Sequence, residues 1–247
     1  MLINFDLKQI EIVVLQILSG DLHLKKLLQD GIDLYRYFAS VMYSKDMHEV
    51  TKEERDSLKA PVLGISYGRG AKALSAESGK SVEWCEEFVN RFYEEFPLVK
   101  VLHDRWIEEV ERTGQLRLQT GVVIKFNKYI WNNKTQKKEK STAWNAKYWT
   151  PEIKNYPVQH TAFVILSTFV AMFFRHKAIY KREKYLLINT VHDSLMLDVR
   201  PEYIEEAKND LKEVLDMLPD TMYNMLEIKI DVPVLAEITE GISWYEV

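Results

Sequence analysis

Strand-like segments lie near both ends of this 247-residue chain, and most of the sequence between them has the spacing of helices. A first short strand, Leu2–Phe5, leads into Asp6; two strands flank a turn within 185–199, and a last pair of strands containing Pro233 runs to Trp244. This order is typical of helices inserted between, and packed on one side of, an antiparallel sheet. The predicted fold class is therefore α+β.

The predicted helices follow from apolar residues that recur every three or four positions. Thr51 with Glu54 three residues later is a capping-box pattern, and the helix that it opens runs towards Gly68. A strand pair is expected at 116–131, with Thr120-Gly121 at its turn. Further helices are expected at about 10–18, 22–29, 33–43, 81–96, 98–112, 157–178 (mostly buried) and 202–218.

The amino-acid composition excludes several classes of protein. Cys85 is the single cysteine, which excludes an internal disulfide framework and a cysteine-based zinc site and favours a reducing, cytoplasmic location. The N-terminal residues do not resemble a signal peptide. The longest apolar stretch, Ala162–Phe174, is shorter than the roughly 20 residues that span a bilayer, so a buried helix and no membrane contact are expected. With a net charge of −4, a nucleic-acid partner would have to be held by a local patch.

Residues 128–149 differ from the rest of the chain. They contain six lysines against one glutamate, interleaved with tyrosines and tryptophans. Two interpretations stay open for this segment. Its lysines and rings suit contact with DNA phosphates and unstacked bases, and they equally suit a solvated surface hairpin whose tryptophans pack locally.

Two carboxylates stand where predicted strands end. Asp193 lies in Val191-His192-Asp193, at the turn between two strands, and Asp6 follows the first strand. Taken alone, each is more often a turn or strand-end residue than a metal ligand. If the two strands are neighbours, both carboxylates converge on one edge of the sheet, as two Mg²⁺ ions about 4 Å apart would require.

The helix that begins at Thr51 has basic, apolar and aromatic side chains on the same side. Arg55, Lys59, Leu63 and Tyr67 recur every four residues and therefore share one side. Two cations, an apolar residue and a ring in this order would suit a nucleotide laid along the helix, with the cations on its phosphates. The alternative is an amphipathic helix with a solvated basic end. Pro61 is expected to kink the helix near Ser57.

These segments, in this order, resemble the family A (Klenow-like) DNA polymerases. Asp6-Leu-Lys-Gln-Ile-Glu-Ile is similar to motif A of that family, Arg55-x3-Lys59-x3-Leu63-x3-Tyr67-Gly68 to motif B, and Val191-His192-Asp193 to motif C. Asn155-x-Pro-x-Gln159-x-Thr resembles the segment that precedes a long palm helix, and Val-Pro-Val-Leu-Ala-Glu with Trp244 resembles the C-terminal strand. Ser194 departs from the pattern, because the family generally has Glu there.

The resemblance implies a role for each matching residue. Asp6 and Asp193, with the backbone carbonyl of Leu7, would hold two Mg²⁺ ions. Arg55 and Lys59 would bind the phosphates and act in catalysis. The other implied contacts are to the incoming nucleotide, from Leu63, Tyr67, Gln9 and Glu11 (which would exclude a ribose 2′-hydroxyl), and to DNA, from Asn155, Gln159 and His192.

The resemblance also implies a division of the chain: palm at 1–20, an inserted helical fingers subdomain at 21–115 with the motif B helix at about 51–68, and palm again at 116–247. The second palm part would contain the basic aromatic insertion 128–149, the motif C hairpin 185–199 and the C-terminal helix and strand. No thumb or exonuclease domain is expected within the chain.

The expected partners are primer–template DNA, deoxynucleoside triphosphates and an upstream polypeptide that carries thumb and exonuclease. Three explanations stay open: the C-terminal half of a naturally split, phage-type polymerase in a bacterial or phage-infected cell, an excised fragment, or a non-catalytic DNA-binding or assembly subunit. His192-Asp193-Ser194 also occurs in single-subunit RNA polymerases, but Gln9-Ile10-Glu11 favours DNA synthesis.

Overall fold

The computed structural model describes residues 1–135 and 137–246, which form two compact units. Unit 1 consists of Met1–Ile17 together with the chain from Gln159 onward, and unit 2 is Leu18–Val158. Helices α1 (Ile10–Ser19) and α9 (Thr150–His176) each run through a boundary between the units. The assignment of palm and fingers to particular ranges stays a prediction.

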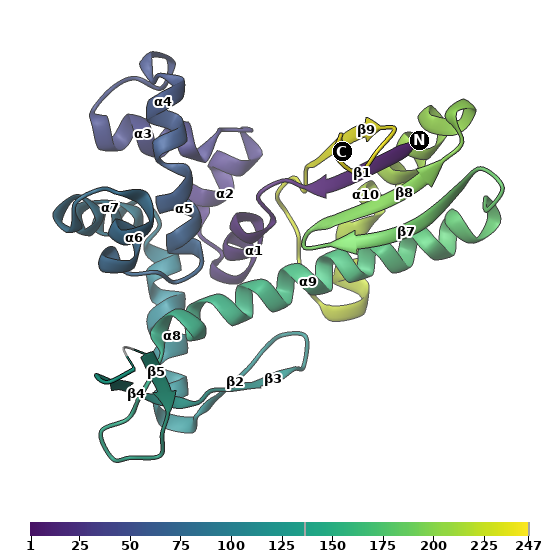
Figure 1. The fold of residues 1–247 in the computed structure, drawn as a ribbon. Coiled ribbons are helices and arrows are strands. Elements are labelled where there is room, and N and C mark those ends of the chain that lie inside the picture. The colour runs from purple at the N-terminus through teal and green to yellow at the C-terminus, as the bar shows by residue number, and fades with distance from the viewer. Residues whose placement is uncertain (136, 247) are drawn as a thin grey trace. The chain divides into compact units, whose positions relative to one another are not determined.

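Unit 1 is built on one antiparallel sheet with the strand order β7-β8-β1-β9. In Figure 1 the purple β1 lies between the green β8 and the yellow β9. The α+β fold class predicted from the sequence is confirmed. The predicted C-terminal strand pair is wrong, because the single strand β9 pairs with β1 instead. The bounds are β1 Leu2–Leu7, β7 Tyr185–Val191, β8 Ser194–Val199 and β9 Ala236–Gly241.

Buried and partly exposed side chains alternate along β1, which shows which face of the sheet is buried. Ile3, Phe5 and Leu7 are buried, and the Phe5 ring stacks on Phe169 of α9 with 4.5 Å between centroids. On the same face, the Tyr185 hydroxyl donates a 2.7 Å hydrogen bond to Asp210 of α10 (Ile204–Leu226). Both helices thus cover one face of the sheet, and Asp6, at an intervening position of β1, lies on the other.

Two helices continue through prolines where the sequence predicted boundaries. Helix α9 begins at Thr150 rather than 157 and contains Pro157, and α10 ends at Leu226 rather than 218 and contains Pro219. The reason is burial beyond each proline: Ile153 before Pro157 and Met222 after Pro219 are core residues. Their apolar burial, about 1.5–3 kcal/mol for each side chain, offsets much of the cost of a missing helical hydrogen bond.

Helix α9 with its continuation to Tyr180 is, by length and composition alone, apolar enough to cross a bilayer. Only one side of it is covered: Phe169 and Phe173 are buried, whereas Phe163 is 65% exposed. The prediction of a mostly buried helix is therefore wrong, since 44% of its most apolar stretch is buried.

Unit 2 is mainly helical, and its core is a cluster of aromatic rings. Phe88, Phe92 and Phe96 lie on one side of α7 and its C-cap, as the sequence predicted, and all three rings pack against Phe38 of α3. The helices are α2 Leu22–Gln29, α3 Leu34–Tyr43, α4 Lys52–Ser57, α5 Lys59–Ser66, α6 Ala71–Ser78, α7 Val82–Glu95 and α8 Pro97–Thr113.

Two small sheets complete unit 2. The turn predicted at Thr120-Gly121 is present, and it joins β2 to β3. The next strand, β4, pairs with β5 and β6 rather than with β2, so the predicted strand pair over 116–131 ends earlier than expected. The bounds are β2 Gln115–Arg117, β3 Val123–Lys125, β4 Lys128–Asn132, β5 Lys137–Lys140 and β6 Lys147–Tyr148.

Candidate active site

The two predicted carboxylates lie together at one end of the unit 1 sheet. Asp6 on β1 is the register partner of Ser194 on β8, and Asp193 precedes Ser194 in the two-residue turn between β7 and β8. The Leu7 amide donates a 3.2 Å hydrogen bond to the Asp193 carbonyl, which joins the turn to β1. The condition under which the two carboxylates converge, that the strand before Asp6 neighbours the hairpin of Asp193, is therefore met.

The end of the sheet that carries Asp6 and Asp193, called the carboxylate edge below, concentrates acidic side chains around Asp6. Burial raises the pKa of the Asp6 carboxyl above its usual range, and the adjacent Asp193 carboxylate raises that pKa further. Glu237 and Glu11 act in the same direction. Like charges this close are unfavourable without a cation between them. The edge is therefore suited to a bound cation.

Glu237 was not assigned a role from the sequence. It lies directly opposite Asp6 on the neighbouring strand β9 and pairs with Lys8 at 3.5 Å. Its signal was present in the C-terminal Val-Pro-Val-Leu-Ala-Glu segment, of which it is the last residue. Only the pairing of β9 with β1 reveals that this glutamate faces the carboxylate site.

Two residues beside the carboxylates have left-handed backbone conformations. Gln9 has a φ of 51°, and its carbonyl accepts hydrogen bonds from the amides of Ile12 and Val13, so it turns the chain from β1 into α1. Glu11 then falls in the first turn of α1, near Asp6. His192 has a φ of 54° in the hairpin turn. Positive φ is uncommon for residues other than glycine and is a mark of constrained sites.

The donor set can be tested for its fit to magnesium. Among the described residues, no group of three or more His, Cys, Asp or Glu side chains has the arrangement of a complete metal site. Magnesium is usually bound through one or two carboxylates, with water and substrate phosphates as the other ligands. Asp6 and Asp193 fit that pattern, and the Leu7 carbonyl is a further ligand only by resemblance.

The predicted phosphate-binding cations lie in unit 2, and both already have carboxylate partners. Arg55 Nε is 2.5 Å from Asp33 Oδ2, and an Arg55 terminal nitrogen is 3.1 Å from Asp56 Oδ1. The same Asp56 oxygen accepts from Lys59 Nζ at 2.8 Å. The structure thus brings Arg55 and Lys59 together at one anion, which a phosphate group could replace.

The helix that carries these cations is interrupted where Pro61 predicted. Helix α4 opens with the predicted capping box and ends at Ser57, Leu58 caps both segments, and Lys59 begins α5. Proline has no amide hydrogen, so the carbonyl of Ser57 has no helical donor at that position. The backbone stays close to helical through Leu58, which keeps Lys59 and Leu63 in line with Arg55.

Tyr67 stands at the end of α5, followed by Gly68 with a φ of +73°. A Cβ atom on Gly68 would lie 2.7 Å from Lys154 Cβ and 2.9 Å from the Pro151 carbonyl oxygen. Glycine is required here for both reasons, and it allows α5 to end directly against the start of α9. That contact fixes the position of Tyr67.

The predicted DNA contacts on α9 differ in exposure. Asn155 is half-buried, and its buried Oδ1 atom has no hydrogen-bond partner in the part of the chain that the structure describes. Gln159, one helical turn later, is exposed. An unpaired buried amide oxygen is costly, so Asn155 is a candidate for a contact made only when a ligand is present.

The sequence model of DNA polymerase family A matches residues 1–246. The chain belongs to this family. It is 30% identical to the thermostable DNA polymerase I of Thermus filiformis, over all of this chain and 27% of that protein. It is 28% identical to DNA polymerase I of Caldicellulosiruptor bescii, over 99% of this chain and 27% of that protein. The chain thus spans about a quarter of the length of these curated relatives.

The fold agrees with this membership. The solved POL domain of Pol1 from M. smegmatis, in a complex with DNA primer-template and dNTP, matches with a TM-score of 0.74. The match covers 98% of this chain and 40% of that one, at 21% sequence identity. It confirms the polymerase-type fold of the chain.

Ser194 follows Asp193 at the carboxylate edge, where the resemblance to family A led us to expect a glutamate. Its hydroxyl donates a 2.9 Å hydrogen bond to the Val191 carbonyl and thereby closes the hairpin turn. Ser194 therefore supports the position of Asp193 and adds no carboxylate of its own.

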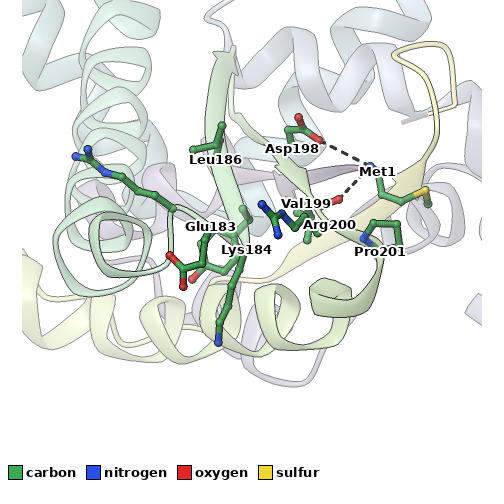
Figure 2. Close-up of a pocket in the computed structure, with 10 residues that line it drawn as sticks. Met1, Glu183, Lys184, Leu186, Asp198, Val199, Arg200 and Pro201 are labelled. Atoms are coloured by element: carbon green, nitrogen blue, oxygen red, sulfur yellow. Dashed lines mark hydrogen bonds and ion pairs between the residues drawn. The ribbon is translucent and has the colours of Figure 1, made fainter.

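A pocket at the opposite end of the sheet contains none of the predicted site residues. Figure 2 shows it around Met1, whose amino group donates a 3.0 Å hydrogen bond to the Val199 carbonyl. Tyr185 pairs with Val199 at this end, whereas Val191 pairs with Ser194 at the other, so strand geometry separates the pocket from Asp193 by about 20 Å. It plays no part in the carboxylate site.

Proposed function

We propose that this chain supplies the catalytic centre of a DNA-directed DNA polymerase, which adds deoxynucleotides to a primer 3′-end. In the reaction, the primer 3′-oxygen attacks the α-phosphorus of the triphosphate, its proton passes to solvent, and the bond to pyrophosphate breaks. Membership of family A supports this activity. The observation that carries the proposal is the meeting of Asp6 and Asp193, from strands almost 190 residues apart, at one sheet edge.

Asp6 and Asp193, with the Leu7 carbonyl, would hold two Mg²⁺ ions. When bound, such ions activate the primer hydroxyl and neutralise charge on the triphosphate. The repulsion between the two carboxylates makes this edge favour cations, and Glu11 and Glu237 strengthen that preference. The proposed role of this edge is therefore to bind the cations and to orient the reacting groups around them.

Arg55 and Lys59 would bind the triphosphate in place of Asp56, whose Oδ1 atom contacts both of them. Because phosphate oxygens accept charge-assisted hydrogen bonds in the same way as a carboxylate, no new arrangement of the cations is needed. Asp33 would continue to hold Arg55 through Nε.

Leu63 and Tyr67, further along α5, would then lie towards the sugar and the base, with Gln9 and Glu11 as further nucleotide contacts. Asn155, Gln159 and His192 would contact the primer–template.

Primer extension with Mg²⁺ and deoxynucleotides tests this function. Asp193→Asn is expected to abolish extension, because it removes one of the two carboxylate charges. Asp216→Asn is the matched control: Asp216 is an exposed carboxylate on α10 in the same unit, outside the carboxylate edge. Equal extension by the two variants would contradict the assignment of the site.

We further propose that a separate or upstream polypeptide, bearing the thumb and exonuclease, completes the enzyme. An apolar groove of about 400 Å³ between α9 and α10 supports this idea, because its rim residues Phe163 and Met225 are 65% and 68% exposed. Apolar surface of this kind is typical of an interface.

If the chain alone does not extend a primer, addition of a thumb-bearing family A polypeptide is expected to restore synthesis. Phe163→Ser on the groove should weaken that rescue, whereas Asp216→Asn should not. Failure of rescue in the presence of a folded partner would favour a non-catalytic DNA-binding subunit.

A further inference from the structure

The basic aromatic segment 128–149 has no part in the proposed chemistry. The structure folds half of its residues into the three-stranded antiparallel sheet β5-β4-β6. Side chains alternate between the two faces of a strand, and directly paired residues share a face. Trp131 pairs with Lys138, and Tyr129 pairs with Lys140 on one side and Lys147 on the other. These five residues make up one face, which we call the lysine–aromatic face.

Lys138 anchors this face. Its ammonium lies 4.7 Å from the ring centroid of Tyr129 and 4.3 Å from that of Trp149, and it pairs with Glu152 at the start of α9 at 2.7 Å. The Tyr129 hydroxyl donates to the same carboxylate at 3.2 Å. The charge of Lys138 is thus neutralised, and its contacts hold the rings in fixed positions.

The other two lysines remain available. Lys140 and Lys147 are exposed, and within the described ranges 1–135 and 137–246 neither ammonium has an ion pair. They flank Tyr129 on adjacent strands, so their backbones are about 10 Å apart. Glu139 pairs with Ile130 and therefore lies on the opposite face. The lysine–aromatic face is positive although the chain as a whole is negative.

Trp131 adds an apolar surface to this positive face. Its side chain is 56% exposed, although it is held in the middle of a paired strand. A flat exposed ring beside two unpaired cations matches the two parts of an unpaired nucleotide, a base and a phosphate. In a duplex the bases are stacked on one another, and only the phosphates could be contacted.

We propose that the lysine–aromatic face binds single-stranded DNA, with a base stacked on Trp131 and neighbouring phosphates on Lys140 and Lys147. The binding goes beyond the proposed synthesis, because it requires neither the carboxylate edge nor a nucleotide. Under this proposal the segment 128–149 binds a single strand of DNA and is not merely a solvated surface hairpin.

The test measures the affinity of the full chain for labelled oligo(dT) of about 16 nucleotides, one site's length for a typical single-strand binder. A chelator and the absence of nucleotides keep binding separate from synthesis. Trp131→Ala is expected to weaken binding about 5- to 100-fold, because the base can no longer stack on the ring. Trp131→Tyr, which keeps a ring, should retain most of the affinity and guards against a folding defect.

Lys140→Gln with Lys147→Gln should lower the slope of log affinity against log salt by about 1.4, or about 0.7 for each phosphate that is no longer neutralised. Lys137→Gln is the matched control: it removes the same charge from the same strand but on the opposite face, and little change is expected. Equal decreases in affinity for Lys137→Gln and Lys140→Gln would overturn the proposal, as would full binding of the oligonucleotide by Trp131→Ala.

Discussion

The carboxylate edge of unit 1 and the cation-bearing helices α4 and α5 of unit 2 differ in how their charged side chains are paired. At the edge, Asp6 is surrounded by Asp193, Glu237 and Glu11, and all of them raise its pKa. On α4 and α5, Arg55 and Lys59 share the carboxylate of Asp56. Like charges therefore oppose one another at Asp6, although Lys8 pairs with Glu237, whereas both cations of α4 and α5 have a carboxylate partner.

The difference indicates how each region would meet a ligand. Opposed carboxylates store repulsion that a cation relieves, so the edge gains stability when it is occupied. Paired cations store none, and a phosphate must displace Asp56 before it can bind. Surface ion pairs contribute little to stability, so this displacement requires little free energy. The carboxylate edge therefore depends on its ligand more strongly than the cation-bearing helices do.

Asp6→Asn is the substitution with the largest expected effect on this contrast. We expect nucleotide addition to fall by at least about 10³-fold, because a ligand of the catalytic cations is removed. We also expect the melting temperature of the metal-free chain to rise, because one of two opposed charges is removed. Primer extension and thermal unfolding in a chelator measure the two effects. A fall in both would show that Asp6 is a structural residue and would break the comparison.

A buried histidine in unit 2 gives the next largest effect. His103 is buried, a hydrogen bond of 3.0 Å joins its Nδ1 to the Tyr93 hydroxyl, and burial lowers its pKa to about 3. The unfolded chain binds a proton on this residue below pH 6.5, whereas the folded chain does not. Stability therefore decreases as the pH falls from about 6.5 towards 3, by about 1.4 kcal/mol per pH unit.

His103→Gln keeps a hydrogen-bond acceptor for Tyr93 but cannot titrate. Its unfolding free energy, measured by denaturant titration from neutral pH to pH 4, should lack this slope. An unchanged slope in the variant would locate the acid sensitivity elsewhere, with ion-paired carboxylates whose pKa is lowered in the folded chain, such as Asp210, as the alternative.

Gly68→Ala tests how the end of the cation-bearing helices is positioned. The new methyl group would meet Lys154 and the Pro151 carbonyl at a left-handed backbone position, so a destabilisation of about 2–4 kcal/mol is expected. Gly79→Ala is the control: its φ is +70° but nothing lies within 4 Å of the added atom, so it should cost only about 1 kcal/mol. Chemical denaturation compares the two, and equal destabilisation would mean that the contact with α9 contributes nothing.

Asp56→Asn is expected to have the smallest effect. It removes the carboxylate that competes for Arg55 and Lys59, so the KM for deoxynucleotides should fall about 2- to 5-fold with kcat nearly unchanged. Steady-state primer extension measures both constants. A rise in KM would show instead that Asp56 organises the two cations for the triphosphate.

Local patterns in the sequence were sufficient for much of this description. The capping box at Thr51, the aromatic side of α7 and the break caused by Pro61 all depend on neighbours within about one helical turn. Each polymerase-like motif is likewise a short run of residues that are close together in the chain. Such features are readable because the groups that interact are close together in the chain.

Tertiary structure alone decided the rest. It paired β1 with β8 and β9, which brought Asp193 and Glu237 to Asp6 from the far end of the chain. It also carried α9 through Pro157, because burial of residues on both sides of the proline outweighed the local signal to stop. Strand pairing and burial depend on residues far apart in sequence, so no short window of the sequence contains them.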